Sequence, residues 1–277
     1  MAKLLTYKDG EYFISFMNGN TPMIISKASP NGIVFTSKEK IRSNPAYYGG
    51  TVAYHSAGGH NWNRNVKLVG DTVYFIDTNC QLVEYDLSKL LGLPEAERAN
   101  FAGKITKGGF SFEELCVDSE HRVTVVSKEG LLSHLTKEDN SVKVDVSKLA
   151  SGKLGTQYGA VETLNGCVAV ASFCPNTKLR AYSVFDANLK LLAFANTKAP
   201  NAYLVKNMLL FVKKDMLHIL AAADPHEADL LVFDGNQTLH FVHTLKLPSH
   251  VYGVVWLKEG EEALICGYGT LKSIKLT

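Results

Sequence analysis

The sequence has 277 residues, of which 46% are hydrophobic and 20% are charged, values typical of a globular protein and not of a disordered or fibrous one. Lys and Arg number 29 against 27 Asp and Glu, and they form no basic stripe, so nucleic acid is not expected as a partner. No apolar run reaches the length of a secretory signal or the ~18 residues of a membrane span, so we expect a cytoplasmic protein with no membrane span.

The first predicted strand is KLLTYK, residues 3–8, and a repeating series of strands follows it. β-branched and aromatic runs of five to eight residues alternate with turn residues, which is typical of short antiparallel strands. The most apolar runs follow one another at intervals of 45 to 51 residues, with centres at Ile24, Phe75, Val125, Val170, Ile219 and Ile265. A period in this range indicates radial or stacked units.

Six units of about 46 residues, each with four strands, account for nearly the whole chain. The last unit ends one strand short. We therefore expect residues 3–8 to supply its missing outer strand, which would close a ring and leave no long open sheet edge.

Three predicted third strands end in an apolar residue followed by aspartate, at Tyr85-Asp86, Phe185-Asp186 and Phe233-Asp234. These pairs stand where WD-repeat-like β-propellers often have Trp-Asp, so the chain resembles the β-propeller superfamily, with the subfamily left open. We predict an all-β fold, a single β-propeller domain over residues 1–277. It would have six four-stranded blades, or seven as the alternative, closed by the N-terminal strand pairing into the last blade.

The stretch YYGGTVAYHSAGGHNWNRN, residues 47–65, lies between the fourth strand of the first unit and the first strand of the second. The resemblance implies that connections of this kind lie on the face with which propellers usually bind ligands. Candidate binding residues in this stretch are His55, His60, Asn61, Trp62 and Arg64.

Residues 88–101 carry the main helix signal, because Pro94 suits a first helical turn and the glutamates after it favour the positive end of the helix dipole. The helix would either cover blade edges or dock a partner.

An aromatic residue opens the predicted first strand of four consecutive units, at Phe112, Tyr158, Tyr203 and Tyr252. These side chains would form a rim at the mouth of the central channel, or else plug the channel against one another. The polar connections 221–230 and 246–252 are expected on the same face, and they add His226 and His250 to the candidates.

Two classes of function fit this face. The first is a non-catalytic scaffold that recognises a protein or peptide partner, because Trp, Tyr and Arg dominate binding hot spots. The alternative is a small-molecule or carbohydrate site, or a metal-dependent enzyme of lyase or lactonase type, in which His55, His60, His226 and His250 would hold a cation. No cofactor motif and no G-x-S-x-G nucleophile elbow occurs, so we expect no cofactor and favour the scaffold.

Overall fold

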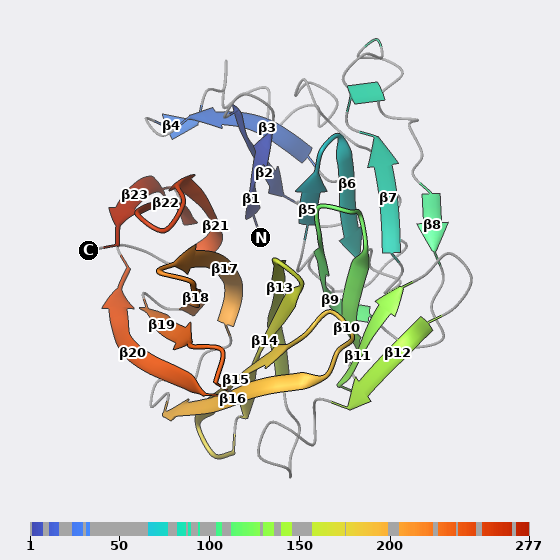
Figure 1. Cartoon of the computed structure of the whole chain (residues 1–277). Helices are drawn as coiled ribbons and strands as arrows, with labels where there is room; N and C mark the ends of the chain where they lie inside the picture. The colour runs from blue at the N-terminus through green and yellow to red at the C-terminus, as the bar shows by residue number, and fades with distance from the viewer. Residues whose placement is uncertain are drawn as a thin grey trace.

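A computed structural model describes the strands of the protein and many of the turns between them (Figure 1). The described residues are 2–7, 11–16, 24–29, 32–33, 66–76, 82–86, 88–89, 94, 104–106, 112–127, 130–135, 140–145, 157–174, 176–198, 205–223, 227–236, 238–247, 251–267 and 270–276. No helix among them is long and apolar enough to cross a membrane.

The described strands form six antiparallel sheets, and within each sheet the strands follow one another in chain order. Sheet one contains β1 (Ala2–Tyr7), β2 (Glu11–Phe16), β3 (Ile24–Ser29) and β4 (Gly32–Ile33). Sheet two contains β5 (Val66–Val69), β6 (Thr72–Ile76), β7 (Leu82–Asp86) and β8 (Lys104–Thr106). Sheet three contains β9 (Phe112–Val117), β10 (Val123–Ser127), β11 (Leu131–Leu135) and β12 (Asn140–Asp145).

The second half of the chain repeats this arrangement with longer strands. Sheet four contains β13 (Gln157–Leu164), β14 (Cys167–Cys174), β15 (Leu179–Phe185) and β16 (Leu191–Lys198). Sheet five contains β17 (Val205–Lys213), β18 (Met216–Ala223), β19 (Glu227–Phe233) and β20 (Leu239–Lys246). Sheet six has three described strands, β21 (Val251–Lys258), β22 (Glu262–Gly267) and β23 (Thr270–Lys275).

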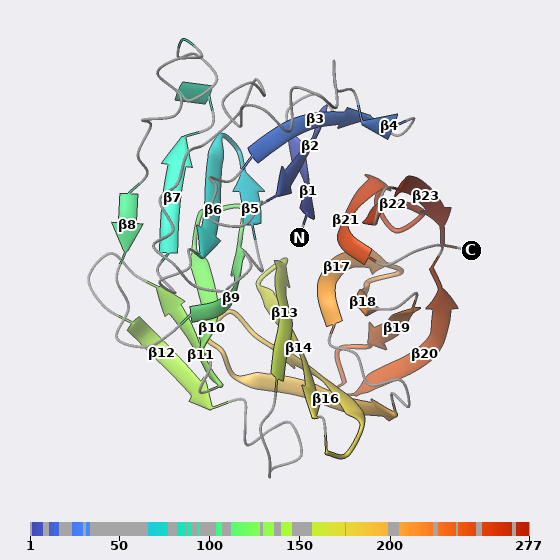
Figure 2. The ribbon, with the colours of Figure 1, turned by 180° about the vertical axis from the view of Figure 1, so that it is seen from behind.

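The six sheets are arranged around a common centre, with the first strand of each innermost (Figures 1 and 2). Each of β1, β5, β9, β13 and β17 contacts the first strand of the next sheet, and β21 contacts β1. The radial architecture and the roughly 46-residue repeat agree with the sequence prediction. The number of sheets, six, is that formed by the described strands.

The position of the N-terminal strand differs from the prediction. Strand β1 pairs with β2, from Ala2 opposite Phe16 to Tyr7 opposite Glu11, and it is the first strand of sheet one. The predicted pairing of this strand into the last sheet is therefore wrong. The reason is that Ile24 lies in a third strand, not a second, so sheet one needs residues 3–8 for itself.

The aspartates after the third strands close turns. Asp186 Oδ1 accepts hydrogen bonds from the backbone N–H groups of Asn188 and Lys190, both at 2.9 Å. Asp234 Oδ1 accepts one from Asn236 N–H at 2.8 Å. These aspartates satisfy backbone donors at tight turns, so the apolar-Asp repeat marks a structural device.

Asp86 accepts a hydrogen bond from the backbone N–H of Lys89 at 3.0 Å, and Ser88 and Lys89 adopt helical geometry. Pro94 lies in neither a helix nor a strand, so the predicted helical turn at this proline is not present. The other residues of the predicted helix lie outside the described residues.

The hydrophobic core lies between neighbouring sheets. Separate clusters join sheets two and three, three and four, four and five, and five and six. The cluster between sheets four and five is the most extensive, and alanines of β14 and β18 let the sheets approach closely there. Burial of sheet faces against each other explains why the second strands read as almost continuous apolar runs.

Candidate functional site

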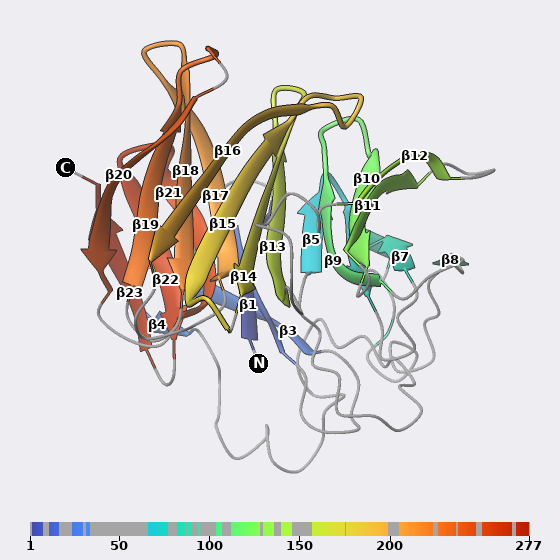
Figure 3. The same ribbon diagram turned by 90° about the horizontal axis from the view of Figure 1, so that it is seen from below.

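The first strands all begin on one side of the molecule and turn into the second strands on the other (Figure 3). We call the side where β5, β9, β13, β17 and β21 begin the connection face, and the side of their hairpin turns the hairpin face. The connections from each sheet to the next, and from each second strand to its third, start and end at the connection face. This order brings together strand ends that are far apart in the sequence.

Four first strands carry a β-bulge near their start, at the second residue of β9, β17 and β21 and at the third residue of β13. The residues without a paired partner in the second strand are Glu113, Gly159, Lys206 and Tyr252. A bulge bends a strand and re-aims its side chains, and bulges are common beside functional sites. Here the bulges form a series at the connection-face end of the centre.

The bulges show which first-strand residues are equivalent. The residue before each bulge is Phe112, Tyr158, Val205 or Val251, and the spacing is nearly constant (158 − 112 = 46, 205 − 158 = 47, 251 − 205 = 46). The predicted aromatic series therefore changes register along the chain. Tyr252 is a bulged residue, one place later than Tyr158, while Tyr203 lies outside the described residues.

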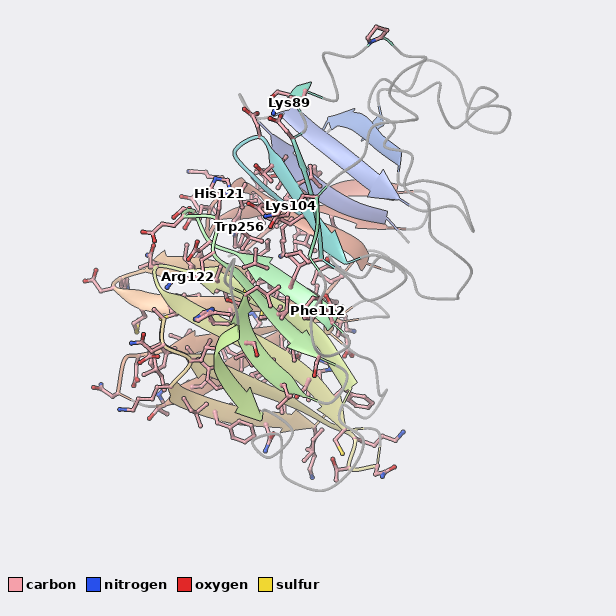
Figure 4. The ribbon with its side chains drawn as sticks, turned by 90° about the vertical axis from the view of Figure 1, so that its right-hand side faces the viewer. Lys89, Lys104, Phe112, His121, Arg122 and Trp256 are labelled. Atoms are coloured by element: carbon pink, nitrogen blue, oxygen red, sulfur yellow. The ribbon has the colours of Figure 1, made fainter. Side chains whose placement is uncertain are left out.

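Phe112 is part of the core, with 1% of its surface exposed. It packs between sheets two and three in a cluster with Tyr74, Leu82 and Val125, and Figure 4 shows it away from the hairpin-face residues His121 and Arg122. The prediction that Phe112 contributes to an exposed rim is wrong, because its large apolar side chain fills the joint between two sheets.

Most of the other predicted binding residues fall outside the described residues: His55, His60, Asn61, Trp62, Arg64, Tyr203, His226 and His250. For Tyr158 and Tyr252 the structure describes the strand position only. Within the described residues, no group of three His, Cys, Asp or Glu side chains could hold a metal ion.

A buried ionic network joins sheets four and five near their connection-face ends. Arg180 Nη1 donates a hydrogen bond to Asp229 Oδ2 at 2.7 Å, and Arg180 Nη2 donates one to Glu227 Oε2 at 2.9 Å. Tyr182 donates its hydroxyl to the same Asp229 oxygen at 2.5 Å, and Thr244 donates to Asp229 Oδ1 at 2.9 Å. Only 2% of Arg180 and 1% of Asp229 is exposed.

This network is electrostatically matched. Burial alone would lower the pKa of Arg180, but the Asp229 carboxylate beside it holds that pKa above its ordinary value. Burial, reinforced by the negative charge of Asp229, raises the pKa of Tyr182 well above 10. Arg180 therefore stays charged and Tyr182 stays neutral, which suits a clamp between sheets and not a proton-transfer site.

This network was not among the predicted sites, although the sequence contains a signal for it. Arg180 and Asp229 are charged residues of third strands, and they are about one repeat apart (229 − 180 = 49). Charged residues that recur at the period of a repeat, at strand positions that should be buried, indicate an ion pair between units.

A second set of equivalent positions lies three residues before the turns of the hairpin face, at Lys67, Glu162, Phe211 and Trp256. Lys67 and Glu162 form an ion pair that joins sheets two and four. Burial alone would lower the pKa of Lys67, but Glu162 raises it. On the other side, Phe211 and Trp256 meet edge to face with ring centres 5.2 Å apart.

Comparisons with known proteins bear on the fold. No protein-family model matches the sequence, and no curated protein gives a significant match. A chain in the crystal structure of BBS1N in complex with ARL6DN, soaked with mercury, matches with a TM-score of 0.53 and 13% identity, covering 96% of this chain and 75% of that chain.

A chain in the crystal structure of the Mitotic Checkpoint Complex matches with a TM-score of 0.51 and 9% identity, covering 99% of this chain and 86% of that chain. These similar structures are β-propellers. The chain has a β-propeller fold. At such low identities the likeness shows the architecture alone, so any function must be argued from the surface of this chain.

Proposed function

We propose that this β-propeller is a non-catalytic scaffold that recognises a protein or peptide partner with its connection face. The observation that carries the proposal is the bulge repeated at the start of β9, β13, β17 and β21. A bulge interrupts the strand ladder and re-aims side chains, so four of them around one end of the centre supply a surface built for recognition.

The sequence places recognition residues in the connections that start and end at this face. Trp62 and Arg64 lie between sheets one and two, and Tyr203 lies between sheets four and five. Trp, Tyr and Arg combine large contact area with hydrogen bonding and dominate binding hot spots. His55, His60, Asn61, His226, His250, Tyr158 and Tyr252 complete the proposed surface, and Phe112 is left out because it is buried.

The similar structures support this choice of function. Both are structures of complexes, one of BBS1N with ARL6DN and one of the Mitotic Checkpoint Complex. A propeller that binds a partner needs shape and anchor residues on one face but no special catalytic group.

The test compares two arginines on opposite faces. The full chain is used as bait to recover its partner, and the affinity of that partner is then measured for Trp62→Ala, Arg64→Ala and Arg122→Ala. Arg122 is exposed in the β9–β10 turn on the hairpin face, where it pairs with Asp118 at 2.9 Å. We expect the first two variants to weaken binding by at least about tenfold, which is 1.4 kcal/mol, and Arg122→Ala to have no effect.

Thermal and denaturant unfolding of the same variants provide the check on structure. Little change in stability is expected for Trp62→Ala, because a binding residue contributes little to folding. A loss above ~2 kcal/mol, the scale of core damage, would make Trp62 a structural plug and contradict the proposal.

A further inference from the structure

The guanidinium of Arg180 has one edge that its partners only half fill. Nε and Nη2 form this edge, and their N–H groups match the two oxygens of a carboxylate. Nη2 donates to Glu227 Oε2 at 2.9 Å, whereas no described residue accepts the N–H of Nε, which is buried. The Arg180 side chain is 3% exposed. Because a buried donor without an acceptor is unfavourable, the edge is suited to a ligand with two oxygens.

The two acidic partners of Arg180 are held differently. Asp229 is buried, and it also accepts hydrogen bonds from Tyr182 and Thr244, so its position is fixed. Glu227 is the first residue of β19, directly after the connection 224–226, and its side chain is 35% exposed. A partly exposed ion pair contributes little to stability. Glu227 can therefore turn toward solvent while Asp229 still balances the charge of Arg180.

The charges around this edge suit a further carboxylate. Three exposed lysines lie at the connection-face ends of strands in sheets four and five: Lys178, Lys198 and Lys246. The described acidic residues at this end of the two sheets are Glu227 and Asp229, and Arg180 neutralises Asp229. The sequence adds Asp224, which lies outside the described residues. Once Glu227 turns away, the described charges beside the edge are mainly positive.

We propose that this edge of Arg180 binds an acidic side chain of the partner, and that Glu227 occupies the site until the partner arrives. The partner's carboxylate accepts hydrogen bonds from Nε and Nη2 together, and Glu227 turns to solvent. This inference rests on the proposed function, because the site lies at the connection face. It adds the chemistry of the partner, which presents a glutamate or an aspartate between sheets four and five.

The test follows the Nε–H resonance of Arg180 by nuclear magnetic resonance in the full chain. The probe is the peptide acetyl-Gly-Glu-Gly-amide, and the controls are the same peptide with Gln, sodium acetate and inorganic phosphate, all at one ionic strength. We expect the Glu peptide to shift the resonance in a saturable way, because Nε gains an acceptor. The Gln peptide should leave it unchanged, and acetate and phosphate should bind more weakly than the Glu peptide.

Variants locate the binding. Glu227→Ala should bind the Glu peptide about fivefold more tightly, because the resident carboxylate no longer competes for the edge. The matched control is Glu261→Ala, which removes an exposed glutamate paired with Lys258 on the hairpin face and should leave the affinity unchanged. Arg180→Lys keeps the charge but not the edge, so it should lose the binding.

Several results would overturn the proposal. One is an Arg180 resonance that the Glu peptide leaves in place, and another is an affinity that Glu227→Ala leaves unchanged or lowers. Equal binding of the Gln peptide would remove the carboxylate from the argument, and equal binding of acetate or phosphate would assign the edge to a free anion. If Arg180→Lys does not fold, the contrast between Glu227→Ala and Glu261→Ala still decides.

This inference and the proposed function fail separately. Trp62→Ala should bind the Glu peptide normally, because Trp62 belongs to the connection between sheets one and two. A recovered partner whose affinity falls in Trp62→Ala but does not change in Glu227→Ala would retain the scaffold and remove the carboxylate site. Peptide binding at Arg180 together with a partner that ignores Trp62→Ala and Arg64→Ala would remove the proposed anchors and retain the site.

Discussion

The two joints of sheet five are held by different chemistry. On the side of sheet four, a buried arginine from β15 reaches two carboxylates of β19, and Tyr182 and Thr244 complete the hydrogen bonding of Asp229. On the side of sheet six, Phe211 packs edge to face against Trp256, whose indole N–H donates to the carbonyl of Leu210 at 3.2 Å. Both joints contain an apolar cluster, to which one joint adds matched buried charges and the other adds aromatic packing.

The difference teaches how each joint fails. A buried ion pair contributes little beyond an apolar replacement of the same volume, but removal of one partner leaves a charge in a low-dielectric interior. The aromatic joint contains no charge that could be left unpaired. Its contribution to stability depends on the volume of the two rings and on the backbone positions that bring them together. Breaking the first joint should therefore be costlier than disturbing the second.

The largest effect is expected for Asp229→Ala. This change leaves Arg180 buried without its main counter-charge, while Glu227 still holds Nη2 of the guanidinium. We expect a loss of about 3 kcal/mol in the free energy of unfolding, at the lower end of the range for breaking a buried pair. Urea unfolding measures it.

Asp234→Ala is the matched control for Asp229→Ala, since it removes an aspartate of the same sheet that lies in a partly exposed turn. It should cost much less than Asp229→Ala, because water can replace the hydrogen bond of an exposed turn. Equal losses in the two variants would contradict the view that removing the counter-charge of buried Arg180 is costlier than removing a hydrogen bond in a turn.

The sequence predicted the repeat and the order of strands well, because burial between sheets imposes an apolar pattern that recurs in every unit. The third-strand aspartates were placed correctly for the same reason, since each unit needs the same turn. The prediction failed for the aromatic residues of the first strands. The series Phe112, Tyr158, Tyr203 and Tyr252 was chosen by residue type, whereas the bulges make Val205 and Val251 the structural equivalents of Phe112 and Tyr158.

The contacts between sheets could not be predicted in this way. Arg180 and Asp229 lie 49 residues apart (229 − 180), and although this spacing is close to one repeat, nothing local to either residue identifies the other as its partner. The assignment of β1 failed for a related reason, because a short strand can pair at either end of a ring and the apolar pattern is the same in both places.

A medium effect is expected at the aromatic joint from Gly260→Ala. Gly260 has a φ of +68°, and a Cβ atom there would lie 2.8 Å from the ring of Phe211. The variant should lose about 2 kcal/mol, the sum of a left-handed backbone and an overpacked contact. Thermal unfolding checks the loss.

Gly235→Ala separates the two causes. Gly235 has a φ of +82°, but a Cβ atom there would meet nothing within 4 Å, so only the backbone penalty of about 1 kcal/mol applies. If both glycine variants lost the same stability, the close contact between residue 260 and the ring of Phe211 would add nothing to the backbone penalty.

The smallest effect separates the joints by pH. His218 stacks on Phe211 with ring centres 4.7 Å apart, and burial lowers its pKa in the folded protein. Because the unfolded chain then binds the proton more readily, the stability from neutral His218 is complete above about pH 6.5 and is lost as the pH falls below it.

The pH dependence expected from Tyr182 is the opposite, since its raised pKa makes the stability fall as the pH rises above about 10. His218→Gln should flatten the acid limb of the stability curve and leave the alkaline limb, and Tyr182→Phe should do the reverse. If either variant changed both limbs, the two joints would titrate as one unit, and the contrast between charge and shape would not hold.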